Sequence, residues 1–221
     1  GYSVLGGIVA GAQVIRLLRR MGFSKLSFSE TILVVSRGSE VWASPVGFLL
    51  VDGRLYARIY KGGRLHGLLA SGVDSLTVCI PGTGLLFYYA VVHKEKLKYE
   101  EREGRWALRG CSALVHCRLA EARDAGPYLE VYLEPLDVLV LSAYPRVFRR
   151  ADYALVEALV YYTKMPHVSR EEARGYYEAL KHLKKAIYRS TKSRAYRKAI
   201  SEIVELAEKA LEKEARRSGN A

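Results

Sequence analysis

Residues 42–69, WASPVGFLLVDGRLYARIYKGGRLHGLL, contain two strand-like runs followed by a turn that is rich in glycine and positive charge. The first run, residues 41–51, is dense in β-forming side chains and ends at Asp52-Gly53, a dipeptide that accepts the positive φ angles of a two-residue hairpin. In the second run, residues 54–60, apolar side chains alternate with polar and aromatic ones, which is typical of a half-buried strand. The stretch therefore predicts a β-hairpin.

The turn after this hairpin, KGGR at residues 61–64, has the composition of an anion-binding loop. Its glycines allow backbone N–H groups to turn toward one point, and Lys61, Arg64 and the upstream Arg58 bring positive charge to that point. The same residue types also occur in ordinary connecting turns, so composition alone fits either role. His66 lies beside the turn and could titrate against a bound phosphate, although a lone histidine is more often a spectator.

Further strand signals on both sides of this stretch indicate an antiparallel sheet. Strands are expected at residues 30–36, 75–80, 111–123 and 128–141. Residues 85–92 are apolar and aromatic, and their periodicity does not distinguish a strand from a helix. Residues 93–109 are hydrophilic and are expected to form a solvated insertion or hairpin. Because hairpins join the expected strands and long helices do not alternate with them, a closed antiparallel barrel is favoured over a doubly wound α/β sheet.

Helical signals frame the expected barrel. Short helices are expected at residues 13–21, where Gly22 stops the helix, and at residues 64–70. Three more are expected near the C-terminus, at residues 152–164, from a capping box at residues 169–172 to about residue 189, and at residues 195–215. The prediction is an α+β chain with an N-terminal extension and short helix in residues 1–22, a barrel domain in residues 23–145 and a helical C-terminal region in residues 146–221.

Composition bounds the class of protein and its compartment. Half of the 221 residues are hydrophobic, which argues against disorder. The formal net charge of +12 favours phosphorylated or polyanionic partners in general terms. Cys79, Cys111 and Cys117 form no paired framework and no zinc spacing, so a reduced cytoplasmic location fits best and no metal site is expected. The apolar run at residues 2–15 is too short and too rich in glycine to span a bilayer.

A basic segment near the C-terminus leaves one functional alternative open. Residues 181–198 hold eight Lys or Arg and no acidic residue. Such a run is typical of the solvated face of two consecutive helices, and it also fits a nucleic-acid-binding patch. The sequence has no nucleophile elbow, Walker P-loop or dinucleotide-binding glycine motif, so catalytic residues stay unassigned.

Several short motifs occur in an order that resembles an archaeal family of uncharacterised flavoproteins. They are ETILVVS at residues 30–36, ASPVG at 43–47, RIYKGGR at 58–64, LTVCI at 76–80 and PRVFRRADYALVEALVYYTKM at 145–165. The resemblance covers roughly residues 17–165 and extends more loosely to the helices beyond. It implies an antiparallel split β-barrel that binds FMN and is related to flavin reductases, followed by a helical region, in a homodimer.

The resemblance also implies which residues hold the cofactor. The flavin ring would be lined by Ser44, Pro45, Val46 and Gly47. The ribityl phosphate would be surrounded by Arg58, Tyr60, Lys61, Gly62, Gly63 and Arg64. The resemblance further implies that the chain is a flavin-reductase-like oxidoreductase. Its small-molecule redox partner and its substrate stay unassigned.

The chain departs from the family's pattern at the phosphate-binding turn. Where a turn of the form Lys-Gly-Ser-x-Thr is expected, Gly63 and Leu65 stand in place of the two hydroxyl residues. Each lost neutral hydrogen bond weakens binding by about 0.5–1.5 kcal/mol, whereas charge-assisted bonds from Lys61 and Arg64 contribute about 1.5–3 kcal/mol each. The expectation is weakened FMN binding. The alternatives are a basic RNA- or polyanion-binding module, and a dimeric split-barrel scaffold with a lost or different cofactor.

Overall fold

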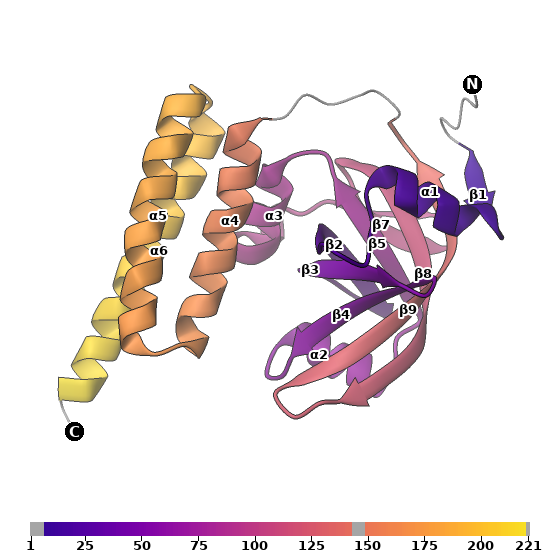
Figure 1. The fold of residues 1–221 in the computed structure, drawn as a ribbon, viewed down its shortest axis with the longest axis horizontal. Helices are drawn as coiled ribbons and strands as arrows, with labels where there is room; N and C mark the ends of the chain where they lie inside the picture. Colours follow the sequence, from indigo (N-terminus) through magenta and orange to yellow (C-terminus); the bar gives the residue numbers. More distant parts are fainter. Residues whose placement is uncertain (1–6, 143–148, 220–221) are drawn as a thin grey trace. The chain divides into compact units, whose positions relative to one another are not determined.

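The computed structural model describes residues 7–142 and 149–219. The chain forms two compact units, Gly1–Gly82 with His93–Pro145 and Thr83–Val92 with Arg146–Ala221. The first unit is rich in strands and the second is helical (Figure 1). The predicted boundary between residues 145 and 146 lies outside the described residues.

The strands of the first unit form a closed antiparallel barrel. They are β1 (Ile8–Ala10), β2 (Ser29–Arg37), β3 (Glu40–Val51), β4 (Arg54–Tyr60), β5 (Ser75–Pro81), β6 (Tyr99–Arg102), β7 (Arg105–Leu108), β8 (Cys111–Asp124) and β9 (Tyr128–Val140). A seven-stranded sheet has the order β1-β9-β4-β3-β2-β5-β8, and β8 also pairs with β9. Six strands therefore close into a barrel, and β1 is added beside β9. The predicted barrel is confirmed.

Turn chemistry sets the register of the β3–β4 hairpin. Asp52 and Gly53 have φ angles of 47° and 77°, which is the backbone that a two-residue type I′ turn requires. The turn aligns Leu50 with Leu55 across the β3–β4 pair. The alternation predicted for β4 follows, because Leu55 and Ile59 are buried whereas Arg58 is exposed.

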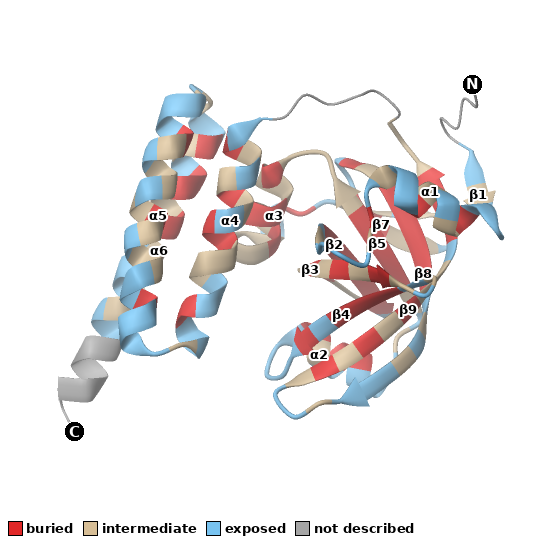
Figure 2. Cartoon of the chain, viewed as in Figure 1, coloured by how far each residue is buried: buried red, intermediate tan, exposed pale blue. Residues whose placement is uncertain are grey.

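The barrel interior is a continuous apolar core, and its buried positions are red in Figure 2. Two helices of the same unit, α1 (Gln13–Met21) and α2 (Arg64–Ser71), contribute to this core. Leu18 of α1 is fully buried, and full burial of such a side chain stabilises the fold by about 1.5–3 kcal/mol. Helix α1 is therefore part of the barrel's core, and β1 ahead of it is a paired strand where a loose extension was expected.

The hairpin of β6 and β7 covers part of the barrel's outer surface. It follows the short 3-10 turn η1 (Lys94–Lys96), and its strand β7 buries Ala107 and Leu108 completely, so the prediction of a solvated segment was wrong for this half of the hairpin. Arg105 of β7 pairs with Asp137, and Asp137 Oδ1 lies 2.6 Å from Nδ1 of the buried His116. Burial lowers the pKa of His116, although Asp137 opposes that shift. The network fastens the hairpin to β8 and β9.

The second unit is a helical bundle. It contains α3 (Gly84–Val92), α4 (Arg150–Lys164), the 3-10 turn η2 (Met165–His167), α5 (Arg170–Ser190) and α6 (Arg194–Gly219). Residues 85–92, which periodicity left undecided, are helical, and the three predicted C-terminal helices are present. None of the helices within the described ranges is both long and apolar enough to cross a membrane.

One carboxylate joins three helices of this bundle. Asp152, in the first turn of α4, accepts a hydrogen bond from the Gly84 N–H at 2.8 Å, and Tyr196 of α6 donates its hydroxyl to the same carboxylate oxygen. Arg149 lies 2.9 Å from the other oxygen. Since the donors come from α3, α6 and the start of α4, Asp152 holds the N-terminal ends of these helices together.

Candidate functional site

A pocket opens where two neighbouring strands of the barrel separate. Strand β4 pairs with β3 only from Leu49 to Val51, whereas residues 40–48 of β3 pair with β2 on their other side. A pocket of about 360 Å³ lies beside this unpaired part of β3, in the range of roughly 300–1,000 Å³ that small ligands occupy. Its walls are formed by Trp42, Ser44, Pro45, Val46, Gly47, Arg58, Ile59, Tyr60, Gly63, Arg64, Leu65, His66 and Lys94.

The β3 wall exposes backbone to the pocket because its residues have short or cyclic side chains. Pro45 is tolerated in this strand because β3 has no β4 partner at that position and a ladder hydrogen bond is not required there. Gly47 is closely packed, since a Cβ atom at this residue would lie 3.2 Å from Oε1 of Glu30 and 3.5 Å from Cβ of Phe28. The hydroxyl of Thr31 donates to the Val46 carbonyl at 2.8 Å and fixes the strand from behind.

The start of α2 forms the opposite wall. Gly63 is the residue before the helix, and Arg64, Leu65 and His66 make its first turn. The first N–H groups of a helix have no partner within the helix and carry a partial positive charge. No acidic residue occupies the first turn of α2 to neutralise that charge. This end of the pocket is therefore suited to an anion.

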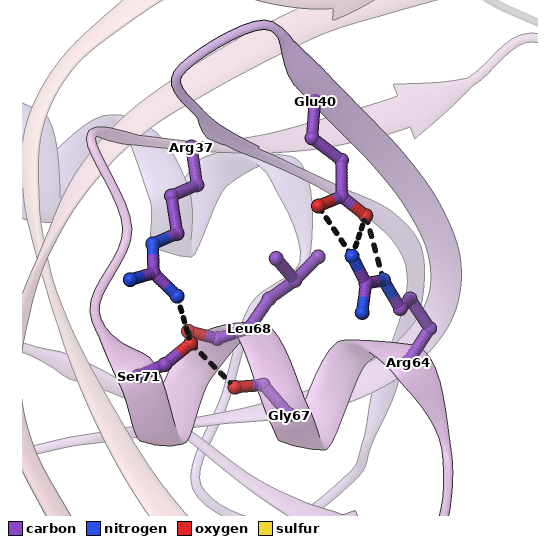
Figure 3. Close-up of polar contacts among 6 residues, drawn as sticks. All are labelled: Arg37, Glu40, Arg64, Gly67, Leu68 and Ser71. Carbon is purple, nitrogen blue, oxygen red and sulfur yellow. Dashed lines mark hydrogen bonds and ion pairs between the residues drawn. The ribbon is translucent and has the colours of Figure 1, made fainter.

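Side-chain contacts at both ends of α2 hold it against the β2–β3 hairpin (Figure 3). At the start of the helix, Nε of Arg64 donates to Oε1 of Glu40 at 2.6 Å, and Nη2 donates to the same carboxylate. At its end, Arg37 donates to the Ser71 hydroxyl at 2.6 Å. The Arg64 guanidinium is thus already engaged by a carboxylate, and an anion in the pocket would have to share it with Glu40.

Lys61 forms an ion pair at the neighbouring turn of the barrel. Its ammonium group lies 2.8 Å from both carboxylate oxygens of Asp124 at the end of β8. This contact lowers the pKa of the Asp124 carboxyl. The Lys61 N–H also donates to the Pro127 carbonyl at 3.1 Å. Lys61 therefore fastens the β4–α2 turn to the β8–β9 turn, and neither Lys61 nor Gly62 contributes to the described pocket wall.

Arg58 belongs to a cross-strand array on the outer surface of β4 and β9. Its Nε donates to the Tyr56 hydroxyl at 3.0 Å, and that hydroxyl donates to Glu130 at 2.7 Å. The Arg58 guanidinium carbon lies 5.1 Å from the centre of the Tyr128 ring. Burial is the main reason that the pKa of Tyr56 is raised. These contacts position Arg58 at the pocket edge. Among the described residues, no carboxylate forms an ion pair with it.

Lys94 was not predicted as a site residue. Its ammonium nitrogen lies 4.5 Å from the centre of the Trp42 ring and donates to the Ala43 carbonyl at 2.7 Å. Burial lowers the pKa of Lys94 to about 8, because desolvation disfavours the charged form. Its place in the sequence, within a run of charged residues after α3, gave no signal that it would reach the β3 wall.

The structure thus brings together most of the residues predicted to hold a cofactor. Those that line the pocket are Ser44, Pro45, Val46, Gly47, Arg58, Tyr60, Gly63 and Arg64. His66, considered as a titrating neighbour of a phosphate, also lines it. The wall residues that sequence reasoning missed are Trp42, Ile59, Leu65 and Lys94. Trp42 could have been found, because it is two residues from Ser44 and therefore on the same side of an extended strand.

Several solved structures are similar to this chain. An FMN-bound protein from Methanosarcina mazei, of the DUF447 family, has a TM-score of 0.69 at 21% identity, over 86% of this chain and 99% of that one. An FMN-binding protein from Thermus thermophilus with bound 1-cyclohex-2-enone has a TM-score of 0.45 at 17% identity, over 55% of this chain and 76% of that one. The flavin reductase of styrene monooxygenase from Pseudomonas putida has a TM-score of 0.45 at 14% identity, over 55% of this chain and 84% of that one.

The similarity to the M. mazei protein confirms the predicted fold, an antiparallel split barrel followed by a helical region. No protein-family model and no curated protein sequence matches the chain. At 21% identity, the similarity to the M. mazei protein shows the fold alone.

Proposed function

We propose that the chain is an FMN-binding flavoprotein whose cofactor occupies the pocket between β3, β4 and α2. The composition of the pocket walls carries this proposal. The backbone of β3 forms one wall, and the N-terminus of α2 lies opposite it together with the cations Arg58 and Arg64. The M. mazei protein, which shares the fold over nearly its whole length, is FMN-bound and supports the proposal.

The residues at the start of α2 fit a phosphate group. The free N–H groups of the first helical turn and the guanidinium of Arg64 converge on one end of the pocket, and Arg58 adds a second cation at its edge. These donors replace the hydroxyls that the chain lacks at Gly63 and Leu65. Lys61 would act indirectly, by holding the turn through Asp124.

The β3 wall fits the planar part of the cofactor. Ser44, Pro45, Val46 and Gly47 present little side-chain bulk, so a flat ring can approach the strand backbone. Trp42 and Lys94 close this side of the pocket, and the positive charge of Lys94 would favour electron density at the ring edge. FMN, when bound, would supply hydride or electron transfer, which makes a flavin-reductase-like oxidoreductase the proposed activity.

We further propose a homodimer in the cytoplasm. Leu26 and Phe28, just before β2, are 86% and 54% exposed, and Phe28 abuts Gly47 of the pocket wall. Exposed apolar side chains of this size next to a site are typical of an interface. Cys79, Cys111 and Cys117 are buried and free, which supports a reducing compartment.

The absorbance spectrum of the purified protein and a fluorescence titration with FMN test the proposed cofactor. The protein should show flavin bands or quench FMN fluorescence on binding. Replacing Arg64 with Gln should weaken binding roughly 10- to 150-fold, as expected for loss of a charge-assisted hydrogen bond of about 1.5–3 kcal/mol. Absence of FMN binding at any concentration would overturn the proposed function.

Two further variants test the assignment of the phosphate end. Lys61→Gln removes the same charge from a residue outside the pocket wall and should change FMN affinity far less than Arg64→Gln. Glu40→Gln removes the carboxylate that engages Arg64 and should tighten FMN binding. If Lys61→Gln weakened FMN binding as much as Arg64→Gln, the assignment of the phosphate to the start of α2 would be wrong.

A further inference from the structure

Two tyrosines and three lysines lie along one face of α5. We call Tyr177, Lys181, Lys184, Lys185 and Tyr188 the tyrosine–lysine face. Their spacing of four, seven, eight and eleven residues from Tyr177 places them on one side of an α-helix. The face spans roughly 16 Å at 1.5 Å per residue, which is long enough for several nucleotides or charged groups.

Cations lie against both rings of this face. The Lys181 ammonium is 5.0 Å from the centre of the Tyr177 ring, and the Lys184 ammonium is 5.8 Å from that of Tyr188. Arg197 of α6 approaches the Tyr188 ring to 4.9 Å. Each ring therefore has a positive charge beside it. In this arrangement a ring and a neighbouring cation can contact the same ligand, the ring through stacking and the cation through an anionic group.

The Tyr188 end of the face is held in place by hydrogen bonds. Arg197 donates from Nε to the Thr191 carbonyl and from Nη2 to the Tyr188 carbonyl, both at 3.0 Å. The Tyr188 hydroxyl lies 2.9 Å from the Ser201 hydroxyl. Although it is fixed in this way, Tyr188 is 40% exposed, so its ring is positioned and accessible.

The cations around this face are largely uncompensated. Lys185, Arg189, Lys192, Arg194 and Lys198 are all exposed. Within the described part of the chain, Lys181 is the cation of residues 181–198 that forms an ion pair, with Glu178 at 2.7 Å. Residues 181–198 contain no acidic residue, and the acids beside the face, Glu178 and Glu208, interact with Tyr177 and Lys181 at one end of it.

We propose that the tyrosine–lysine face, together with Arg197, binds single-stranded nucleic acid. The rings would stack on unpaired bases and the surrounding cations would neutralise phosphates. A duplex buries its base faces and would not use the rings, so a single strand is the favoured ligand. This activity is independent of the pocket in the barrel and of FMN.

Fluorescence anisotropy of the full chain with a labelled single-stranded oligonucleotide of about 16 nucleotides tests the charge component. Affinity should fall steeply with salt, with a log–log slope of about −0.7 per neutralised phosphate. The variant Lys184→Gln/Lys185→Gln/Arg189→Gln should make that slope shallower by about 2. The matched control Arg16→Gln/Arg19→Gln/Arg20→Gln removes three exposed cations from α1 and should leave binding nearly unchanged. An equal loss in both variants would overturn the proposal.

The tyrosine rings provide the second test. Tyr188→Ala should weaken binding roughly 5- to 150-fold, which is the effect of losing one stacking contact, whereas Tyr188→Phe keeps the ring and should bind normally. Heparin supplies charge without bases and should bind Tyr188→Ala as well as it binds the unmodified chain. If Tyr188→Ala bound the oligonucleotide normally, the surface would be a general polyanion site and the proposal would be wrong.

Discussion

Gly63 is the residue at which the phosphate end of the pocket can be altered with least disturbance. Its backbone is extended, with φ −92° and ψ 162°, and a Cβ atom there would meet nothing within 4 Å. A serine at this position could donate a hydrogen bond to a phosphate, which contributes about 0.5–1.5 kcal/mol. We expect Gly63→Ser to bind FMN roughly 2- to 12-fold more tightly, as measured by fluorescence quenching.

Gly47→Ser is the control for this prediction. It adds the same hydroxymethyl group to the pocket wall, but its Cβ atom would lie 3.2 Å from Oε1 of Glu30. Since the Glu30 carboxylate has to shift by a few tenths of an ångström to make room, Gly47→Ser should not tighten FMN binding. Unchanged affinity in Gly63→Ser, with far-UV circular dichroism unaltered, would show that the phosphate does not reach the start of α2.

Lys94 is expected to make the proposed FMN binding depend on pH. Its pKa is lowered to about 8 by burial, so Lys94 is charged below pH 8 and neutral above it. A phosphate monoester, with a second pKa of about 6, keeps its full charge over this range. We expect FMN affinity to fall as pH rises from about 7 to about 9, because the pocket loses a positive charge.

Arginine in place of Lys94 tests the origin of that pH dependence. A guanidinium stays protonated throughout, so the affinity of Lys94→Arg for FMN should be flat between about pH 7 and pH 9. An identical fall in Lys94→Arg and in the unmodified chain would assign the titration to another group, and the charge of Lys94 would then have no part in cofactor binding.

At the scale of elements, local signals in the sequence were sufficient wherever turn or cap chemistry decides the structure. Asp52-Gly53 specified the β3–β4 turn, Gly22 ends α1 with φ 108°, and the capping box of Ser169 and Glu172 opens α5. Residues 85–92 could not be assigned in advance because α3 is apolar nearly all round, which removes the periodic signal. Lys94 was missed for another reason, since only the folded chain brings it to Trp42.

Gly84 allows α3 and α4 to approach closely within the helical unit. A Cβ atom at Gly84 would lie 2.9 Å from the Asp152 carbonyl oxygen and 3.1 Å from the Asp152 Cα, and these backbone atoms cannot rotate away. We expect Gly84→Ala to destabilise the helical unit by about 1–3 kcal/mol. Urea unfolding of the full chain, followed by far-UV circular dichroism, measures the change.

The matched substitution lies in the same unit. Gly175 is inside α5, and a Cβ atom there would meet nothing within 4 Å. Because alanine has the higher helix propensity, Gly175→Ala should stabilise the unit by up to about 1 kcal/mol. Equal effects of the two substitutions would mean that helix propensity, and not the contact with Asp152, governs position 84.

The proposed homodimer places a requirement on the surface beside the pocket. Leu26 and Phe28 are among the most exposed large apolar side chains of the described residues, and Phe28 abuts the Gly47 wall. We expect the unmodified chain to have twice the monomer mass in size-exclusion chromatography with light scattering. Leu26→Glu/Phe28→Glu should shift it to monomer, because burying two carboxylates at an interface is unfavourable.

Ile8→Glu/Leu136→Glu is the matched control, since these side chains are 45% and 40% exposed on β1 and β9. It adds the same charge to apolar positions away from Phe28 and should leave the dimer intact. Because Phe28 lies beside Gly47 of the pocket wall, Leu26→Glu/Phe28→Glu should also reduce FMN affinity, whereas the control should bind FMN normally. If the control were monomeric and the Leu26→Glu/Phe28→Glu protein dimeric, the interface would lie on β1 and β9. FMN binding would then be independent of the segment that precedes β2.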